Sequence, residues 1–239
     1  MRLPWRVAKV GEVRRETAQA ATLALDLADW PGHLAGQHVD VRLTAEDGYQ
    51  AERSYSIASA PEDDHLILTV ERLDEGEVSP YLTETLQPGD DLELRGPIGG
   101  YFAWSASLGG PLLLVAGGSG VVPLRAILRH DRATGSDVPA RLLYSARTRA
   151  DLVYPAELDG YGTIITLTRE QPQGWDGRTG RIARELLAEA GWPAAQRPLV
   201  YVCGPTGFVE GVADALVALG HEPSRIRTER FGPTRPCGG

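Results

Sequence analysis

A glycine-rich turn between two apolar stretches is the part of the sequence best suited to hold an anion. The unbroken apolar run 112–116 leads into Gly117, Gly118 and Gly120, and Pro123 fits the first turn of a following helix. Glycines let the backbone approach a ligand closely, and the free amides at a helix start attract phosphate. A tight strand-to-helix turn without a ligand explains the same residues, and the turn is not a GxGxxG fingerprint. On these residues alone both interpretations stay open.

Basic side chains follow several predicted strands of the second half. Arg147 and Arg169 come shortly after the apolar stretches 141–145 and 163–168, and Arg181 follows in a later loop. A forked guanidinium group suits a phosphate monoester, so these three arginines are candidates for one phosphate site. Solvated surface arginines are the alternative, because arginine is frequent in this chain.

Two short motifs in the first half carry groups that suit an anion. In ERSYSIAS, strand alternation places Arg53 and Tyr55 on one face, where they can hold an anion and stack on a planar ring. In GEVSPYL, Ser79 is a good N-cap and Pro80 fits the first helical position, so a helix is expected to begin there. Each motif has a plain alternative, a polar strand face for the first and a hydrated helix end for the second.

Two residues near the end of the chain are further candidates. Cys203 ends an apolar run and begins the motif CGP, and Glu229 lies in the last predicted strand. Ligands of open α/β sheets bind at the carboxyl ends of the strands, which is where Cys203 falls. A packed, inert cysteine and a solvated carboxylate are the alternatives for the two residues.

The composition is that of an ordinary globular protein and excludes some classes of function. The 239 residues are 42% hydrophobic and 23% charged, with a formal net charge of −8. That charge argues against a general nucleic-acid binder, which needs a basic face. The first residues carry charge throughout, and no stretch reaches the roughly 20 apolar residues of a membrane helix. We therefore expect a cytoplasmic protein without a membrane span.

Cysteine usage limits the metal chemistry. The chain has two cysteines, Cys203 and Cys237, fewer than the four thiolates of an ordinary iron–sulfur cluster. We expect no metal centre of its own and no disulfide framework, and we expect Cys237 to be a thiol of a disordered tail.

The first half of the chain has the pattern of an antiparallel β domain. Short segments with a two-residue alternation are separated by Gly, Pro and Asp turns, which favours a closed barrel or a sandwich over a parallel sheet. One helix is expected at 79–86. The expected strands span residues 7–17, 21–28, 38–43, 53–59, 65–72 and 92–95.

The second half has the pattern of a doubly wound α/β domain. Short strands without alternation take turns with helices, as in a parallel sheet that is covered on both faces. The expected strands span 112–116, 141–145, 163–168, 199–203 and 226–231, with helices at 122–132, 182–190 and 207–219. We expect a β-barrel domain at 1–104, a linker at 105–110 and an α/β domain with a C-terminal tail at 111–239.

Seven motifs in this order resemble the ferredoxin-NADP reductase family, and together they cover nearly the whole chain. They are RSYS, GEVS, GPIGGYF, GGSGVVP, YSART, CGP and ERF. The resemblance implies a flavin-binding antiparallel β-barrel followed by a dinucleotide-binding domain with a doubly wound parallel sheet. It also favours the phosphate-binding interpretation of the glycine turn.

The resemblance implies a flavin site in the first domain. Arg53 would pair with the flavin phosphate, Tyr55 would pack on the isoalloxazine ring, and Ser56 would lie close to the reactive nitrogen of the ring. The backbone amides around Val78 and Ser79 would cradle the same phosphate. FAD is implied through the family, with FMN as the less favoured alternative.

The resemblance also implies a dinucleotide site in the second domain. Phe231 would cover the flavin and move aside for the nicotinamide, while Ser56, Cys203 and Glu229 would be the catalytic residues along the hydride path. NADPH is expected over NADH because of the three arginines. The residues implied for NADP are Gly117, Gly118, Ser119, Gly120, Pro123, Ser145, Arg147, Arg169, Arg181, Cys203, Gly204 and Pro205.

The activity that the resemblance implies is that of a flavoprotein oxidoreductase. It would pass a hydride from NADPH to bound FAD and electrons onward to a redox partner such as ferredoxin. Because a four-cysteine cluster domain is absent from the sequence, the acceptor is expected to be a separate iron–sulfur protein or another acceptor. The alternatives are a free flavin or quinone reductase and a flavin-binding electron relay without NAD(P)H turnover. The stretch GPTRPCGG after Phe231 departs from the family pattern.

Overall fold

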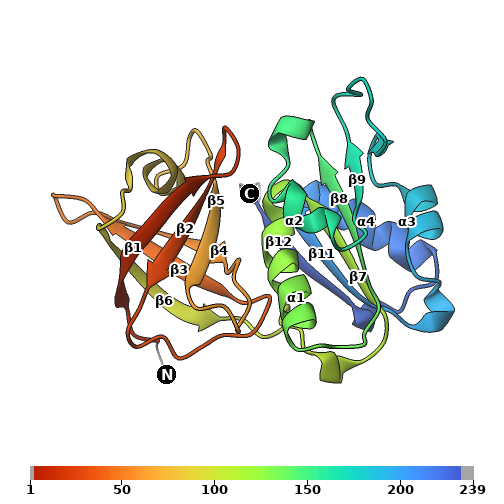
Figure 1. Ribbon diagram of the computed structural model, residues 1–239, viewed down its shortest axis with the longest axis horizontal. Coiled ribbons are helices and arrows are strands. Elements are labelled where there is room, and N and C mark those ends of the chain that lie inside the picture. Colours follow the sequence, from red (N-terminus) through yellow and green to blue (C-terminus); the bar gives the residue numbers. More distant parts are fainter. Residues whose placement is uncertain (1–2, 233–239) are drawn as a thin grey trace, which may run out of the picture.

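The alternating segments of the first half form six antiparallel strands in the computed structural model, which describes residues 3–232 (Figure 1). Alternation places one side chain in two on the inner face, so each short strand contributes a few apolar residues to a common core. The strands are β1 (Arg6–Arg15), β2 (Ala20–Asp26), β3 (His38–Thr44), β4 (Gln50–Ser56), β5 (Leu66–Glu71) and β6 (Asp91–Ile98).

These six strands close into a barrel. They form one sheet in the order β4-β3-β6-β1-β2-β5. An isolated antiparallel bridge between Ile57, just after β4, and Leu68 of β5 joins the two ends of this order. Val39, Val41 and Leu94 are fully buried inside. The expected antiparallel β-barrel is confirmed.

The second half forms a parallel sheet with helices on both faces, as expected for a doubly wound domain. The strands are β7 (Leu112–Gly117), β8 (Ala140–Ala146), β9 (Ile164–Leu167), β10 (Arg178–Thr179), β11 (Leu199–Pro205) and β12 (Ile226–Phe231). Their order in the sheet is β10-β9-β8-β7-β11-β12, so β7 lies between β8 and β11. The helices are α1 (Val121–Ala133), α2 (Pro155–Asp159), α3 (Arg184–Ala190) and α4 (Thr206–Ala218).

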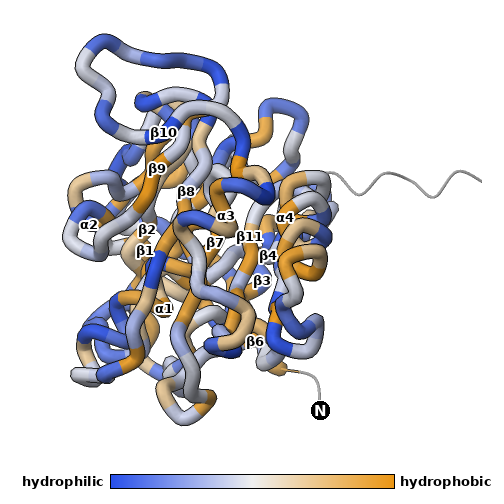
Figure 2. The backbone as a smooth tube through the Cα atoms, turned by 90° about the vertical axis from the view of Figure 1, so that its right-hand side faces the viewer, coloured by the Kyte–Doolittle hydropathy of each residue, from blue (hydrophilic) through white to orange (hydrophobic). Residues whose placement is uncertain are grey.

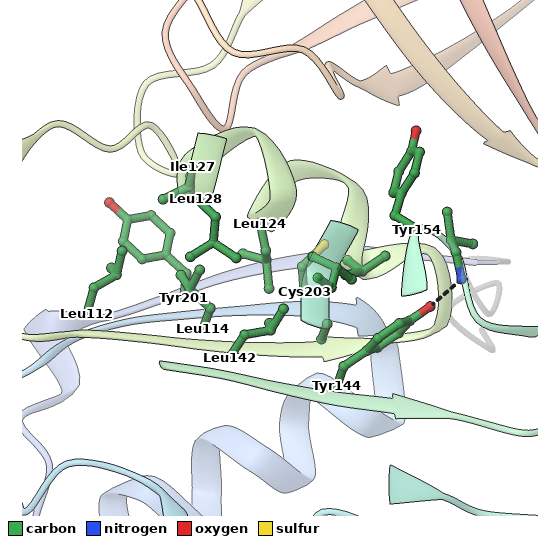
Figure 3. Close-up of a cluster of buried hydrophobic side chains, with 14 of the residues drawn as sticks. Leu112, Leu114, Leu124, Ile127, Leu128, Leu142, Tyr144, Tyr154, Tyr201 and Cys203 are labelled. Carbon is green, nitrogen blue, oxygen red and sulfur yellow. Dashed lines mark hydrogen bonds between the residues drawn. The ribbon is translucent and has the colours of Figure 1, made fainter. Parts of the chain in front are cut away.

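The central strand β7 is apolar on both faces because both faces are covered. Leu112 and Leu114 pack into the cluster that contains α1, whereas Leu113 and Val115 pack against α3 and α4. Figure 3 shows the first of these clusters, with Cys203 within it. In Figure 2 the inner strands are hydrophobic, while the loop that connects β9 to β10 is hydrophilic. Burial on both faces explains why the run that precedes the glycine turn lacks alternation.

The barrel and the α/β half share a packed boundary, with α1 lying between the two sheets (Figure 1). Trp104 is 2% exposed and belongs to the same cluster as α1. The hydroxyl of Tyr201 donates to the carbonyl of Ala103 at 3.0 Å, and Arg125 donates to the carbonyl of Ala58 at 2.7 Å. Polar groups of one half are therefore satisfied by the backbone of the other.

A few local elements differ from the sequence prediction. The helix expected at 79–86 is a short π-helix, Tyr81–Thr85, in which the amide of Leu86 donates to the carbonyl of Tyr81. The strand β10 and the helix α2 were not expected, because two and five residues are too few for a periodic signal. A single 3-10 turn, Ala106–Leu108, lies in the expected linker. Cys237 lies outside the described residues.

Within residues 3–232, no helix is both long and apolar enough to cross a bilayer.

Candidate active site

A cavity of about 370 Å³ lies where the carboxyl edge of the parallel sheet faces the barrel. Strand ends and loops from both halves form its walls, which is the position at which open α/β sheets bind ligands. Of the residues predicted from the sequence, the cavity is lined by Gly117, Gly118, Ser119, Ser145, Arg147, Pro205 and Phe231. The barrel contributes Gln19, Ala20 and Glu71, among others.

The glycine turn has a packing reason as well as room for a ligand. A Cβ atom on Gly120 would lie 2.1 Å from the carbonyl oxygen of Cys203, and one on Gly117 would lie 2.8 Å from the ring of Phe208. Gly118 differs, because it has a φ of +56° and the nearest atom to its Cβ position is a Glu71 carboxylate oxygen at 4.0 Å. Gly117 and Gly120 therefore leave no room for a side chain, because α4 and β11 lie too close to them. At Gly118 the left-handed backbone conformation favours glycine.

Helix α1 begins directly after this turn and directs its free amides toward the cavity edge. The turn itself is one 3-10 segment, Gly118–Gly120, and Pro123 lies in the first turn of α1. The positive end of a 13-residue helix favours an anion at this point. The turn, the helix and the cavity thus provide the geometry of an anion site.

Charged side chains at the cavity already form a small network. The hydroxyl of Ser119 donates to Glu71 Oε2 at 2.6 Å. Arg147 Nη2 lies 3.3 Å from an Asp151 carboxylate oxygen and 3.8 Å from Glu71 Oε1. Arg147 is thus partly neutralised by one carboxylate from its own loop and one from the barrel.

The three predicted arginines are not equivalent in the structure. Arg147 lines the cavity, whereas Arg169 and Arg181 are exposed and are not among the lining residues. The backbone amide of Arg169 donates to the carbonyl of Arg147 at 2.8 Å, so these two loops run side by side. Binding of one phosphate by all three would require Arg169 and Arg181 to turn toward Arg147.

Cys203 and Glu229 lie beside each other on neighbouring strands. The parallel register pairs Cys203 of β11 with Glu229 of β12. The carboxylate of Glu229 also lies 3.9 Å from Nδ1 of His38, which stands at the start of β3 in the barrel. His38 is paired with Ser56 in the β3–β4 ladder. Three predicted catalytic residues are therefore connected across the boundary through His38.

Burial shifts the protonation of this group toward neutral forms. Burial raises the pKa of Glu229 to about 7 and lowers the pKa of His38 below its usual value. The pKa of the Cys203 thiol is raised well above its usual range, first by burial and then by the nearby Glu229 charge. At neutral pH the thiol is protonated, and Glu229 is the group that titrates in this range.

The two predicted flavin motifs come together on the barrel. Arg53 Nη2 lies 2.6 Å from Glu77 Oε2, so the guanidinium group of RSYS reaches the GEVS loop. Val78 and Ser79 are buried, and the hydroxyl of Ser79 accepts from the amide of Leu73 at 3.0 Å. A half-exposed arginine beside this loop suits a phosphate group, which would take the place of Glu77 as its partner.

The ring-stacking position and the lid position are consistent with a planar ligand. Tyr55 follows Arg53 by two residues, packs against the barrel core and has a pKa raised by burial. Phe231 lines the cavity at the end of β12, where the register pairs it with Pro205. Arg53, Tyr55 and Ser56 are not among the lining residues of the cavity itself. The residues present therefore fit a flavin held on the barrel next to the cavity.

Sequence reasoning missed Glu71, His38 and Phe208. Glu71 and His38 lie on barrel strands, and their partners lie 48 and 191 residues further along the chain. Phe208 packs on Gly117 and also on Gly204, whose Cβ position lies 2.7 Å from its ring. The available signals were local: a charged residue ending β5, a histidine beginning β3 and an aromatic residue in the first turn of α4.

Among residues 3–232, no group of three or more His, Cys, Asp and Glu side chains is arranged to hold a metal ion.

Comparison with family models assigns both halves. Residues 6–103 match the oxidoreductase FAD-binding domain, and residues 114–214 match the oxidoreductase NAD-binding domain. Together these two matches cover the residues that form the barrel, the glycine turn and the CGP motif.

Three relatives of known name are similar along most of the chain. Ferredoxin–NADP reductase B of Sorangium cellulosum is 35% identical over 242 residues, covering 94% of this chain and 96% of the relative. NADH oxidoreductase HCR of Escherichia coli is 32% identical, covering 95% of this chain and 68% of the relative. The glycine betaine monooxygenase reductase subunit of Chromohalobacter salexigens is 32% identical, covering 83% of this chain and 56% of the relative. The chain thus spans little more than half of that last relative.

Solved structures agree with this assignment of the fold. The flavohem-like FAD/NAD-binding domain of nitric oxide dioxygenase from Vibrio cholerae has a TM-score of 0.85 at 27% identity, covering 97% of this chain and all of that one. A ferredoxin NADP+ reductase from Neisseria gonorrhoeae has a TM-score of 0.82 at 20% identity, covering 95% and 98%. The second comparison supports the fold alone.

Proposed function

Because the chain belongs to the ferredoxin reductase-like family of FAD- and NAD-binding oxidoreductases, we propose that it oxidises NAD(P)H and delivers the electrons to a separate acceptor. The observation that carries this proposal is the cavity at the boundary of the two domains. One wall is the glycine turn at the start of α1, and Phe231 and the barrel provide the others. When bound, FAD supplies the group that accepts the hydride and from which the electrons pass to an acceptor.

On this proposal the barrel holds the flavin. Arg53 binds the phosphate, with the backbone around Val78 and Ser79 as its second wall, and Tyr55 packs on the ring. This is supported by the contact between Arg53 and the GEVS loop. Ser56 lies at the end of β4, next to the His38 that reaches Glu229. Ser56 and His38 would therefore contact the ring on the side of the barrel that faces the second domain.

The α/β domain holds the dinucleotide on the same proposal. The turn from Gly117 to Gly120 binds the pyrophosphate at the helix start, and CGP at the end of β11 lies near the nicotinamide. The buried thiol of Cys203 stays protonated, so it adds no charge to the path of the hydride. Phe231 excludes water from the ring until the nicotinamide takes its place. Exclusion of water and fixed orientation are the main contributions a protein makes to such a transfer.

The choice between NADPH and NADH depends on the basic residues near the cavity. The preference for NADPH expected from the sequence rests on three arginines, and Arg147 alone of the three lines the cavity. Asp151 and Glu71 already lie close to it. We therefore propose either dinucleotide as the electron donor.

The acceptor is the finer part of the proposal. Relatives are named as reductases of ferredoxin and as reductase subunits of monooxygenases. We propose a separate one-electron carrier, such as a ferredoxin or another iron–sulfur protein, as the acceptor of this chain.

Comparison of acceptors tests this proposal. With NAD(P)H as donor, kcat/KM for a ferredoxin from the same cell is expected to exceed kcat/KM for free FMN or a quinone by at least about a hundredfold, since docking adds affinity and orientation. Equal values for the three acceptors would instead indicate a free flavin or quinone reductase.

A further inference from the structure

A carboxylate from the barrel occupies the edge of the glycine turn. Glu71 ends β5 and extends across the domain boundary, where Ser119 donates a hydrogen bond of 2.6 Å to its Oε2. The same oxygen lies 4.0 Å from the Cβ position of Gly118. The side chain of Glu71 is 30% exposed, so its contact with Ser119 is partly shielded from water. An internal anion therefore lies at the place where the helix start favours an anion.

The charge balance of the cavity makes this position unfavourable for a phosphate. The charged residues that line it are Glu71, Asp151 and Arg147, an excess of one negative charge. Arg147 lies within 3.8 Å of both carboxylates, so its charge is shared between them. A second anion near Ser119 would meet Glu71 at close range, and repulsion between like charges is strong in a partly desolvated site.

We propose that Glu71 limits the affinity for dinucleotides by competing with their pyrophosphate for the glycine turn. This role rests on the proposed function and belongs to a residue outside the glycine turn and the CGP motif. The dinucleotide binds only when the carboxylate withdraws from Ser119, and after oxidation the carboxylate returns and favours release. Because the pyrophosphate is common to NADH and NADPH, Glu71 weakens both to a similar degree.

Replacement of the charge without loss of shape tests the inference. In the flavin-loaded full chain, Glu71→Gln is expected to lower the Kd of NAD+ and of NADP+ by about tenfold at about 0.1 M salt, measured by isothermal titration calorimetry. At about 1 M salt the gain should become smaller but stay above about twofold, because salt screens a partly buried pair of charges less than an exposed pair.

A matched control separates the local charge from the total charge. Glu75→Gln removes the same charge from an exposed position in the neighbouring loop and is expected to leave both Kd values within about twofold of wild type. A Glu71→Gln effect no larger than that of Glu75→Gln overturns the inference, and so does weaker binding. A gain confined to NADP+ overturns it as well, since the charge would then act on a phosphate other than the pyrophosphate.

The failure of the proposed function has a different signature. If the wild-type chain and Glu71→Gln bind neither dinucleotide, the proposed electron donor is wrong and the inference falls with it. If wild type binds dinucleotides and Glu71→Gln does not change their Kd, only the role of Glu71 is wrong.

Discussion

Protonation of single residues at the domain boundary follows from burial. Glu229 is half-buried beside Cys203, and this partial burial raises its pKa to about 7, whereas an exposed glutamate titrates near 4.5. The groups that face it are His38 from the barrel and Cys203 from β11, and burial favours the neutral forms of both. Glu229 is therefore the member of this group that changes charge near neutral pH.

This burial predicts a pH dependence of stability. Between about pH 4.5 and pH 7 the folded state holds a proton on Glu229 that the unfolded state has lost, so the free energy of unfolding falls as pH rises. The loss of stability reaches at most about 3.5 kcal/mol above pH 7, because the shift from 4.5 to about 7 counts about 1.4 kcal/mol per pKa unit. Glu229→Gln should remove it, so that the variant gains stability relative to wild type between pH 5 and pH 8, as measured by urea unfolding.

The same variant separates a catalytic from a structural role. Glu229→Gln should retain a full complement of flavin and reduce it at least about tenfold more slowly, because the carboxyl group lies on the proposed hydride path. Loss of flavin, or a stability difference that stays constant with pH, would contradict this assignment.

The residues with local motifs could be predicted from the sequence, and those defined by long-range contacts could not. The glycine turn and the CGP motif are contiguous, so their spacing carries the signal. The roles of Glu71 and His38 depend on their contacts with Ser119 and Glu229, respectively, in the other domain. No two-residue or 3.6-residue period encodes a contact between side chains on different sheets.

At the scale of elements, the glycine turn depends on how closely α1, β7 and β11 approach one another. A Cβ atom on Gly120 would lie within 2.8 Å of three backbone atoms of Cys203 and Gly204. Backbone atoms of a central strand cannot move aside as a flexible side chain can. This approach brings the amides of the turn to the edge of the cavity.

Substitution at the turn should therefore be costly before any ligand is considered. Gly120→Ala is expected to lower the free energy of unfolding by about 3 kcal/mol or more, as measured by chemical denaturation. Gly211→Ala is the control, because its position in α4 is exposed with no atom within 4 Å, and it should raise stability by about 0.5 kcal/mol. Equal effects of the two substitutions would show that close packing does not determine the turn.

Most elements were predictable because their patterns are periodic and long enough to read. The unbroken apolar run of β7 and the alternation of β3 correctly indicated a covered parallel strand and a barrel strand. The helix predicted at 79–86 is present, but it is a π-helix at Tyr81–Thr85, because hydrogen bonding there runs from Leu86 to Tyr81 over one residue more than in an α-helix. Side-chain spacing alone does not distinguish these two patterns over so short a segment.

At the scale of the whole molecule, polar contacts fix the position of the two halves relative to each other. The hydroxyl of Tyr154 contacts the hydroxyls of Thr22 and Thr69 in the barrel, and Arg125 lies 4.2 Å above the Tyr154 ring. Arg129 of α1 forms an ion pair with Asp63. These contacts join the barrel to the α/β half, so they fix the spacing between the flavin wall and the dinucleotide wall on which the proposed transfer depends.

Anaerobic rapid mixing of the FAD-loaded chain with NADH or NADPH is the most direct test of the proposed activity. We predict loss of the visible absorbance of oxidised flavin in a single turnover, at a rate above about 1 s⁻¹ with at least one of the two dinucleotides. Flavin that stays oxidised for minutes with both dinucleotides, although a chemical reductant bleaches it, would contradict the account.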